Sequence, residues 1–203
     1  MGCLKKYSSL VLLLLSVYGA IAQKRTVGNV QQWMIQKASR LQVAGSTNVN
    51  KFLCEIKEYA QTDTLIMLKN QQQIGLNGSV VLDVSSFDCH NAMMTHDLRK
   101  TMKAKEFPRF YIKFLNLQSL PDLHVNTPQT INGQVNILLS GVERNLTINY
   151  QFIKVSATEA RLVGQQLITF TEFGLIPPRK LGGMIKAKDE LNVIFELHLK
   201  LMD

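Results

Sequence analysis

Residues of the types used in catalysis and metal binding gather at positions 85–96. Ser85, Ser86, Asp88 and His90 could support nucleophilic catalysis, but no G-x-S-x-G elbow accompanies the serines. His90 and His96 are six residues apart, which places them about 240° apart around a helix and prevents them from binding one metal ion. The simpler interpretation is a turn in which Asp or Ser caps the helix that follows. We therefore expect no catalytic residue, no metal site and no cofactor.

The segment LRKTMKAKEFPRFYIKF, residues 98–114, has a composition that could bind nucleic acid. It contains six basic and four aromatic residues, and such a mixture can contact phosphates while its rings stack on bases. Pro108 divides the segment, because proline lacks an amide hydrogen and disfavours a helical residue before it. The charges then belong mainly to one element and the rings to the next, so we expect no nucleic-acid partner.

A short helix is predicted around residues 92–105. Met94, Leu98 and Met102 recur every four residues, which places them on one helical face. Lysines cluster toward the end of this segment, where the helix dipole favours cations. Beyond Pro108, alternation would direct Phe110, Ile112 and Phe114 to one side of a strand.

The rest of the chain has the alternation of apolar and polar residues that is typical of β-strands. In LNVIFELHLKLM, residues 191–202, every second residue is apolar, and only a strand places alternate residues on one side. Less regular alternation predicts strands in RLQVAG, KFLCEIKEY, TLIMLK, NGSVVLDV, FYIKFLNL, INGQVNILL, NLTINYQFIKV and RLVGQQLITF. These make about nine strands, or about eight if TLIMLK is irregular, with no linker between domains. The expected fold class is a single all-β domain, either a sandwich or an up-and-down barrel.

The first 22 residues have the pattern of a signal peptide. Two lysines precede an apolar run, and Ala20 and Ala22 form an A-x-A-type cleavage site. No stretch has the roughly 18 apolar residues of a membrane helix, so we expect cleavage before Gln23 and a protein that is not transmembrane. Its location would be the periplasm or the extracellular space, with residues 23–203 as one domain. Removal of the two lysines lowers the formal charge from +8 to +6, and a basic chain suits anionic partners or simply stays soluble.

Export would leave two cysteines, Cys54 and Cys89, in a compartment where thiols tend to pair. We predict a disulfide between them. Closing this loop of about 35 residues stabilises a fold by roughly 3–4 kcal/mol in the chain-entropy model. The alternative is a reactive thiol that the neighbouring His90 activates.

Several motifs, in their order along the chain, resemble those of the YceI-like family of secreted lipid-binding proteins. KEFPRFYIKF is similar to the family's F-P-x-I-x-F signature, and INGQVNILLSGVERNL resembles its G-x-L-x-x-x-G-V-x-R pattern. A Trp-x-Ile opening at Trp33, the TEFGL turn and the LGGMIKAKDELNVIFEL ending complete a resemblance over residues 33–201. The chain departs from the family at GSTNVNKFLC, where many members carry a His-Ser pair, and at Phe170, where they carry an arginine.

The resemblance implies a lipocalin-like antiparallel barrel of about eight strands that holds an isoprenoid-type lipid. A barrel of this size can hold one ligand or be filled by its own side chains, and an apolar tail binds by burying CH₂ groups at roughly 0.8 kcal/mol each. The inward-facing residues expected to line such a site are Phe52, Val80, Leu82, Phe110, Ile112, Phe114, Ile137, Phe152, Phe170 and Phe195. Each could equally be ordinary core, because alternation does not show whether a face meets a ligand.

Three functions remain open at the level of sequence. The first is an exported, non-enzymatic carrier, storage or stress-related protein for an isoprenoid-type lipid, with anionic lipid head groups as a further candidate partner. The second is a basic interaction module with a side-chain-filled barrel that binds an anionic surface or another exported protein. The third, and the least supported, is a hydrolase that uses His90 or His96. Both a monomer and a dimer fit the sequence.

Overall fold

The computed structural model describes residues 30–69 and 74–202, so the signal peptide expected at residues 1–22 lies outside the described residues. The helical elements are α1 (Ala92–Thr101) and three single 3₁₀ turns at 84–86, 171–173 and 181–183. None of the helices in these ranges has the length and apolar character needed to span a bilayer. The strands are β1 (Val30–Ile35), β2 (Arg40–Thr47), β3 (Lys51–Ile56), β4 (Thr64–Lys69), β5 (Ile74–Asp83), β6 (Arg109–Leu117), β7 (Gln129–Leu139), β8 (Val142–Lys154), β9 (Glu159–Thr169), β10 (Arg179–Lys180) and β11 (Ile185–Leu201).

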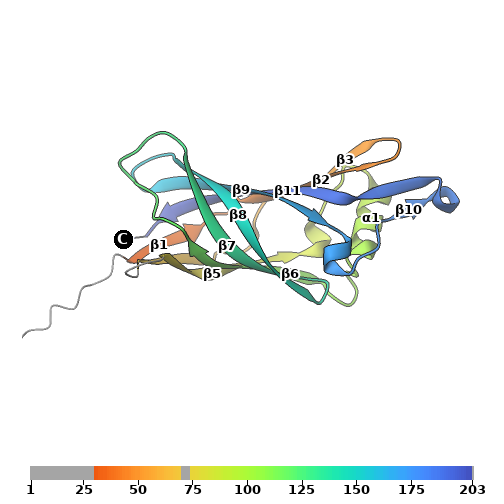
Figure 1. The fold of residues 1–203 in the computed structure, drawn as a ribbon, viewed down its shortest axis with the longest axis horizontal. Helices are drawn as coiled ribbons and strands as arrows, with labels where there is room; N and C mark the ends of the chain where they lie inside the picture. The colour runs from red at the N-terminus through yellow and green to blue at the C-terminus, as the bar shows by residue number, and fades with distance from the viewer. Residues whose placement is uncertain (1–29, 70–73, 203) are drawn as a thin grey trace, which may run out of the picture.

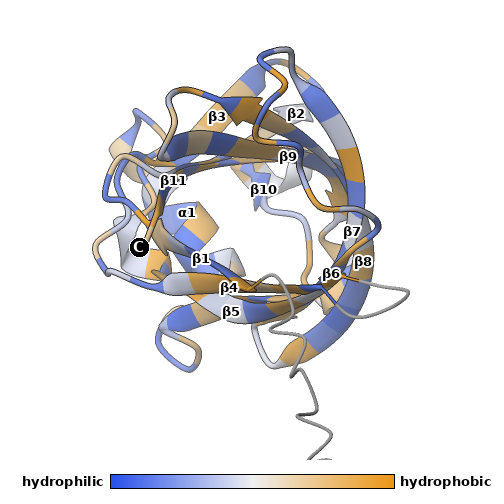
Figure 2. Ribbon diagram, turned by 90° about the vertical axis from the view of Figure 1, so that its left-hand side faces the viewer, coloured by the Kyte–Doolittle hydropathy of each residue, from blue (hydrophilic) through white to orange (hydrophobic). Residues whose placement is uncertain are grey.

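The strands close into an antiparallel barrel of eight strand positions. From β4 the sheet runs through β5, β6, β7, β8 and β9 to β11, and β1 closes the ring by pairing with both β11 and β4. β2 continues β1 along β11, and β3 continues β4 along β2, so each of these pairs forms one bent strand. The view along the barrel shows the closed ring, with α1 across its far end (Figure 2). The predicted all-β barrel with one helix is confirmed, and the sandwich alternative is excluded.

All nine predicted strands are found, and three features differ from the prediction: the strands β1 and β10 and the start of β11. TLIMLK is a regular strand, β4, because Leu65 and Met67 point into the core. Two strands were not predicted: β1, whose six residues bury only Trp33 and Ile35, and the two-residue β10. β11 begins at Ile185 rather than at residue 191, because its first six residues are mostly charged and extend beyond the barrel wall as a ribbon with β10 (Figure 1).

The predicted helix is confirmed and begins at residue 92 as expected, but its end and its capping residue differ from the prediction. α1 ends at Thr101 rather than near residue 105, because Lys103 has a left-handed backbone with φ of 53° and residues 102–106 form turns. The capping residue is Asn91, whose side-chain oxygen accepts a hydrogen bond from the amide of Met94, and not a preceding Ser or Asp. Asparagine caps a helix as well as serine or aspartate does, so the Ser and Asp residues of the preceding SSFD turn wrongly indicated the capping residue.

The basic and aromatic segment is divided between two elements, as predicted. Phe110, Ile112 and Phe114 are buried on β6, whereas Tyr111 and Lys113 on the same strand are exposed. The lysines between α1 and Pro108 are exposed at the other end of the segment. Its charges and buried rings therefore do not form one surface.

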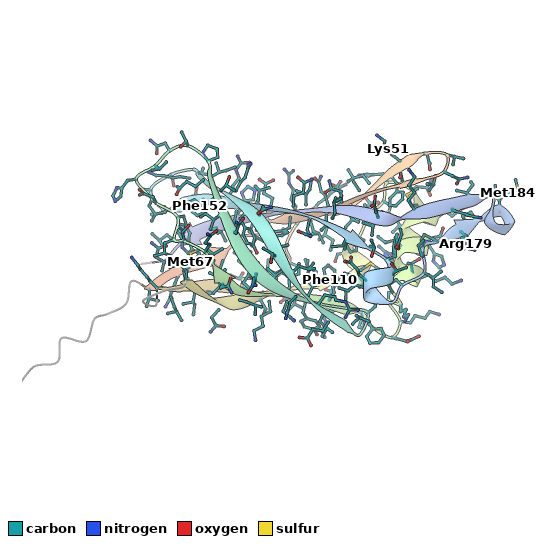
Figure 3. The ribbon with its side chains drawn as sticks, viewed as in Figure 1. Lys51, Met67, Phe110, Phe152, Arg179 and Met184 are labelled. Carbon is teal, nitrogen blue, oxygen red and sulfur yellow. A yellow bond between two sulfur atoms is a disulfide. The ribbon has the colours of Figure 1, made fainter. Side chains whose placement is uncertain are left out.

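The end of the barrel that carries the C-terminus, here called the packed end, is filled by side chains. Trp33 packs edge-to-face against Phe152, with ring centroids 6.0 Å apart, and both residues are almost completely buried. Phe152 and Met67 lie in the left half of Figure 3, whereas Phe110 lies toward the opposite end. The other fully buried side chains of this end include Leu65, Leu117, Ile148, Leu162 and Leu199.

One glycine of the barrel wall makes room for an aromatic ring. Gly164 on β9 is paired with Phe195 on β11, and a Cβ atom at Gly164 would lie 2.2 Å from the Phe195 ring. We expect Gly164→Ala to lower the free energy of unfolding by about 1–3 kcal/mol, as overpacking does. Urea denaturation checks this, with Gly75→Ala as the control, since its Cβ would meet nothing closer than 3.9 Å. Equal stability of the two variants would contradict the prediction.

The predicted disulfide between Cys54 and Cys89 is present. Cys54 lies on β3 and Cys89 in the segment that leads into α1, so the bond fastens this segment to the barrel wall. Backbone hydrogen bonds between Glu55 and Asp88 lie beside it. The alternative of a reactive thiol is excluded, because both sulfur atoms are bonded.

Candidate binding cavity

A wholly apolar cavity lies inside the barrel beneath α1. This middle cavity has a volume of about 80 Å³. Strand residues supply one wall, α1 and the residue that follows it supply Leu98 and Met102, and the segment after β9 supplies Phe170, Phe173 and Leu175. A single water molecule needs roughly 10–15 Å³ and at least two polar partners, so this cavity is large enough for water but too apolar to hold it well.

A smaller inner cavity continues from the middle cavity toward the packed end. Its volume is about 20 Å³, and it shares Leu41 and Ile112 with the middle cavity. Its polar edge includes Tyr59, whose hydroxyl donates a hydrogen bond to Asp63 and accepts one from the amide of Val81. Burial, and then the hydrogen bond to Asp63, raise the pKa of Tyr59 above its usual value, so the phenol is neutral at physiological pH.

A mouth cavity of about 360 Å³ opens at the end of the barrel opposite to the packed end. It lies between the β2–β3 hairpin, α1 and the β10–β11 ribbon, and it shares Leu98 and Phe170 with the middle cavity. Lys180 on β10 forms an ion pair with Asp97 on α1 across this mouth, with 2.8 Å between nitrogen and oxygen. The three cavities therefore follow one another from the surface into the barrel, with Leu98 and Phe170 at the first boundary.

Nine of the ten residues that the sequence analysis selected for a lipid site line these cavities. Phe110, Ile137 and Phe170 line the middle cavity; Val80, Leu82, Phe114 and Phe195 line the inner one; Ile112 lines both; and Phe52 lines the mouth. Phe152 instead lies in the packed end against Trp33. Contact of any of these residues with a lipid remains a prediction.

Phe170 is the one wall residue outside the strands that was selected from the sequence, and the others were missed. Leu98 of α1 and Met102, which directly follows α1, had been placed on one helical face, but nothing in their spacing indicated that this face covers a barrel. Phe173 and Leu175 follow β9 and have no periodic pattern. Phe170, which stands where the resembling family carries an arginine, leaves this wall apolar.

The histidines considered for metal binding or catalysis lie outside the cavities. Nε2 of His90 is 3.0 Å from a carboxylate oxygen of Glu55, and His96 lies in a surface groove beside Arg99, Lys100 and Lys103. Within residues 30–69 and 74–202, no three His, Cys, Asp or Glu residues gather in a geometry that could hold a metal ion.

A partly buried carboxylate on β11 holds three strands together. Glu196 accepts hydrogen bonds from Arg40 of β2, at 2.6 Å from one guanidinium nitrogen, and from Arg161 of β9 at 3.0 Å. Its third neighbour is His198, with Nε2 at 3.1 Å. Burial alone would raise the pKa of Glu196, but the hydrogen bonds from the two arginines outweigh it and lower the pKa below its usual value of 4.5.

We expect Glu196→Gln to make stability less dependent on pH below about pH 4.5, the usual pKa of this group. A lowered pKa in the folded state means that the carboxylate stabilises the fold above its unfolded pKa, and that this contribution is lost as the pH falls through the folded pKa. At neutral pH the variant should lose about 1–2 kcal/mol, because the arginines are partly exposed. Denaturation of both proteins across pH 3–7 checks this, and a constant difference between them would contradict it.

Comparisons with known proteins give a family and several structural relatives. A family model for the YceI-like domain matches residues 24–199. Burkholderia cenocepacia BcnA has a similar structure, with a TM-score of 0.61 and 15% identity over 81% of this chain and 98% of BcnA. A polyisoprenoid-binding domain from Saccharophagus degradans, implicated in plant cell wall breakdown, gives a TM-score of 0.57 and 13% identity over 83% of this chain and 97% of that domain. The YceI protein of Campylobacter jejuni gives 0.53 and 10% over 71% of this chain and 84% of that protein. No curated protein matches the sequence.

Proposed function

The chain belongs to the YceI-like family, and from this premise we propose that it is an exported, non-enzymatic protein that holds an isoprenoid-type lipid inside its barrel. The observation that carries the proposal is the succession of cavities from the mouth to the interior, with an entirely apolar chamber in the middle. An apolar chamber selects ligands by burial of hydrocarbon and offers no group for chemistry.

The shape of the site supports entry of a lipid tail from the mouth. The middle cavity is much smaller than a long isoprenoid, whereas the mouth cavity is larger and partly polar. Side-chain rotation of Leu98 and Phe170 would join the two, because these residues border both. A head group would then remain near Lys180 and Asp97 while the tail occupies the barrel.

The disulfide supports export. Disulfides persist in oxidising compartments such as the bacterial periplasm and the extracellular space, and Cys54 and Cys89 form one here.

The class of ligand has a second support besides the apolar cavity. The chain shares its fold with the polyisoprenoid-binding domain from Saccharophagus degradans.

Native mass spectrometry of the protein purified from its own host tests ligand and export together. We expect a chain that begins at Gln23, together with a bound mass that organic solvent extracts and that fragments as an isoprenoid. The delipidated protein should then take up a fluorescent prenyl probe until saturation. A protein that carries no lipid and takes up no probe would overturn the proposal and favour the alternative of a basic interaction module.

A further inference from the structure

Exposed apolar side chains gather around the mouth of the barrel. Met184 and Leu181, at the tip of the β10–β11 ribbon, are 73% and 67% exposed, and Val49 in the β2–β3 turn and Met93 in the first turn of α1 are each 65% exposed. The side chain of Asn48 donates a hydrogen bond to the carbonyl of Met184 and accepts one from the amide of Lys186, so the β2–β3 turn is held against the tip of the ribbon. Exposed apolar side chains that come together at one end of a protein indicate an interaction site.

Cations without local partners surround these apolar tips. Lys51, Arg179 and Lys186 are exposed, and none of them forms an ion pair with another residue of the described ranges. Arg179 and Lys186 stand directly opposite each other in the β10–β11 ribbon, and like charges in such positions destabilise a strand pair. An anionic partner at this end would compensate for that repulsion.

The same residues border the opening through which a lipid would enter. Val49 and Met93 also line the mouth cavity. Lys51, Arg179 and Met184 lie together at the right-hand end of the molecule, far from Phe152 (Figure 3). A surface that combines apolar tips and cations around an opening is suited to the boundary between the head groups and the acyl chains of a bilayer.

We propose that the mouth end of the barrel docks on an anionic phospholipid bilayer, with Leu181, Met184, Val49 and Met93 inserted below the head groups and Lys51, Arg179 and Lys186 on their phosphates. The mouth cavity would then open directly into the membrane. This docking proposal depends on the proposed function in one respect only: it takes the bilayer to be the source of the lipid that the barrel binds.

Charge argues for a membrane rather than for a second copy of the chain. A symmetric dimer through this surface would bring Arg179 and Lys186 of the two copies toward one another, and like charges across an interface are unfavourable. A bilayer that contains phosphatidylglycerol instead supplies many negative charges and an apolar layer beneath them.

Co-sedimentation with lipid vesicles tests the proposal. The mature protein should bind vesicles of phosphatidylcholine mixed with phosphatidylglycerol, bind pure phosphatidylcholine weakly, and lose binding as salt is added. Lys51→Gln with Lys186→Gln should lower the partition coefficient roughly 25-fold, since each cation near an anionic surface contributes about five-fold. Leu181→Ser with Met184→Ser should lower it at least about ten-fold, because less apolar surface is inserted.

Matched variants at the packed end serve as controls. Lys200→Gln and Val155→Ser remove an exposed cation and an exposed apolar side chain there and should leave vesicle binding unchanged. Absence of binding to the anionic vesicles, or equal losses in the mouth and control variants, would overturn the proposal. So would a dimer in solution that the two mouth variants dissociate.

The same variants separate this proposal from the proposed function. Leu181, Met184, Lys51 and Lys186 do not line the three cavities, so uptake of a prenyl probe from solution should be unchanged in both mouth variants. Normal probe uptake without vesicle binding would overturn the docking surface alone. Vesicle binding with the expected losses, but without probe uptake, would overturn the proposed ligand and support the docking surface.

Discussion

Ile168→Trp is expected to lower the affinity of the protein for a prenyl probe at least about ten-fold. Ile168 on β9 lines the middle cavity, and an indole in place of its side chain would occupy much of the space that the probe needs. Ten-fold corresponds to about 1.4 kcal/mol, which is the contribution of fewer than about two buried CH₂ groups. Exclusion of even a small part of the tail therefore suffices, and fluorescence titration measures it.

The adjacent residue provides the control for this variant. Leu167 lies on the same strand but is 65% exposed on the outer face, so Leu167→Trp should bind the probe as the unchanged protein does. Circular dichroism and urea denaturation show whether Ile168→Trp remains folded, with an expected loss of no more than about 3 kcal/mol. A folded Ile168→Trp protein with normal affinity would show that the middle cavity does not hold the probe.

Replacement of both cysteines, Cys54→Ala with Cys89→Ala, is expected to cost the largest amount of stability. The bond joins residues 35 apart in sequence, and the chain-entropy model assigns about 4 kcal/mol to a loop of this length. Stabilities of whole domains are only about 5–15 kcal/mol, so the variant should unfold at a much lower urea concentration. Its secondary structure at low temperature should remain that of a barrel, because the sheet closes through β1 and β11 and not through the disulfide.

Chemical reduction of the unchanged protein is the companion measurement. Reduction should lower the midpoint of unfolding by a similar amount, and should leave the double alanine variant unaffected. A variant with the stability of the oxidised protein would show that β3 and the segment before α1 are held by other contacts, such as the backbone hydrogen bonds between Glu55 and Asp88.

The barrel could be predicted because the alternation of apolar and polar residues in each strand is visible directly in the sequence. On β6, the burial of Phe110, Ile112 and Phe114 follows directly from their period of two. β1 was missed because Trp33, Met34 and Ile35 are three consecutive apolar residues after two glutamines, so no alternation is visible in its sequence. The early end of α1 depends on the left-handed backbone of Lys103, and a lysine in a sequence gives no sign of this conformation. The capping residue could not be predicted because Asn91 and several polar neighbours can all cap a helix.

The candidate site could be predicted only in part, for a related reason. Alternation identifies inward-facing residues but not their depth along the barrel, so it grouped Phe152 of the packed end with Phe110 of the middle cavity. Whether an inward face encloses space depends on side chains from distant elements, here Leu98 of α1 and Phe173 after β9. The mouth surface depends on tertiary structure even more, since its residues come from three separate segments.

The bends in two of the barrel strands have a consequence for how stability is distributed. The break between β1 and β2 and the break between β3 and β4 lie side by side, because the amide of Tyr59 donates to the carbonyl of Lys37. They also fall near the border between the packed end and the cavities. Because the backbone pairing is interrupted twice at this level, we expect a lower local stability, measurable by amide hydrogen exchange, in the mouth half than in the packed half. If the barrel holds a lipid, as proposed, partial opening of the mouth half would release that lipid without global unfolding of the protein.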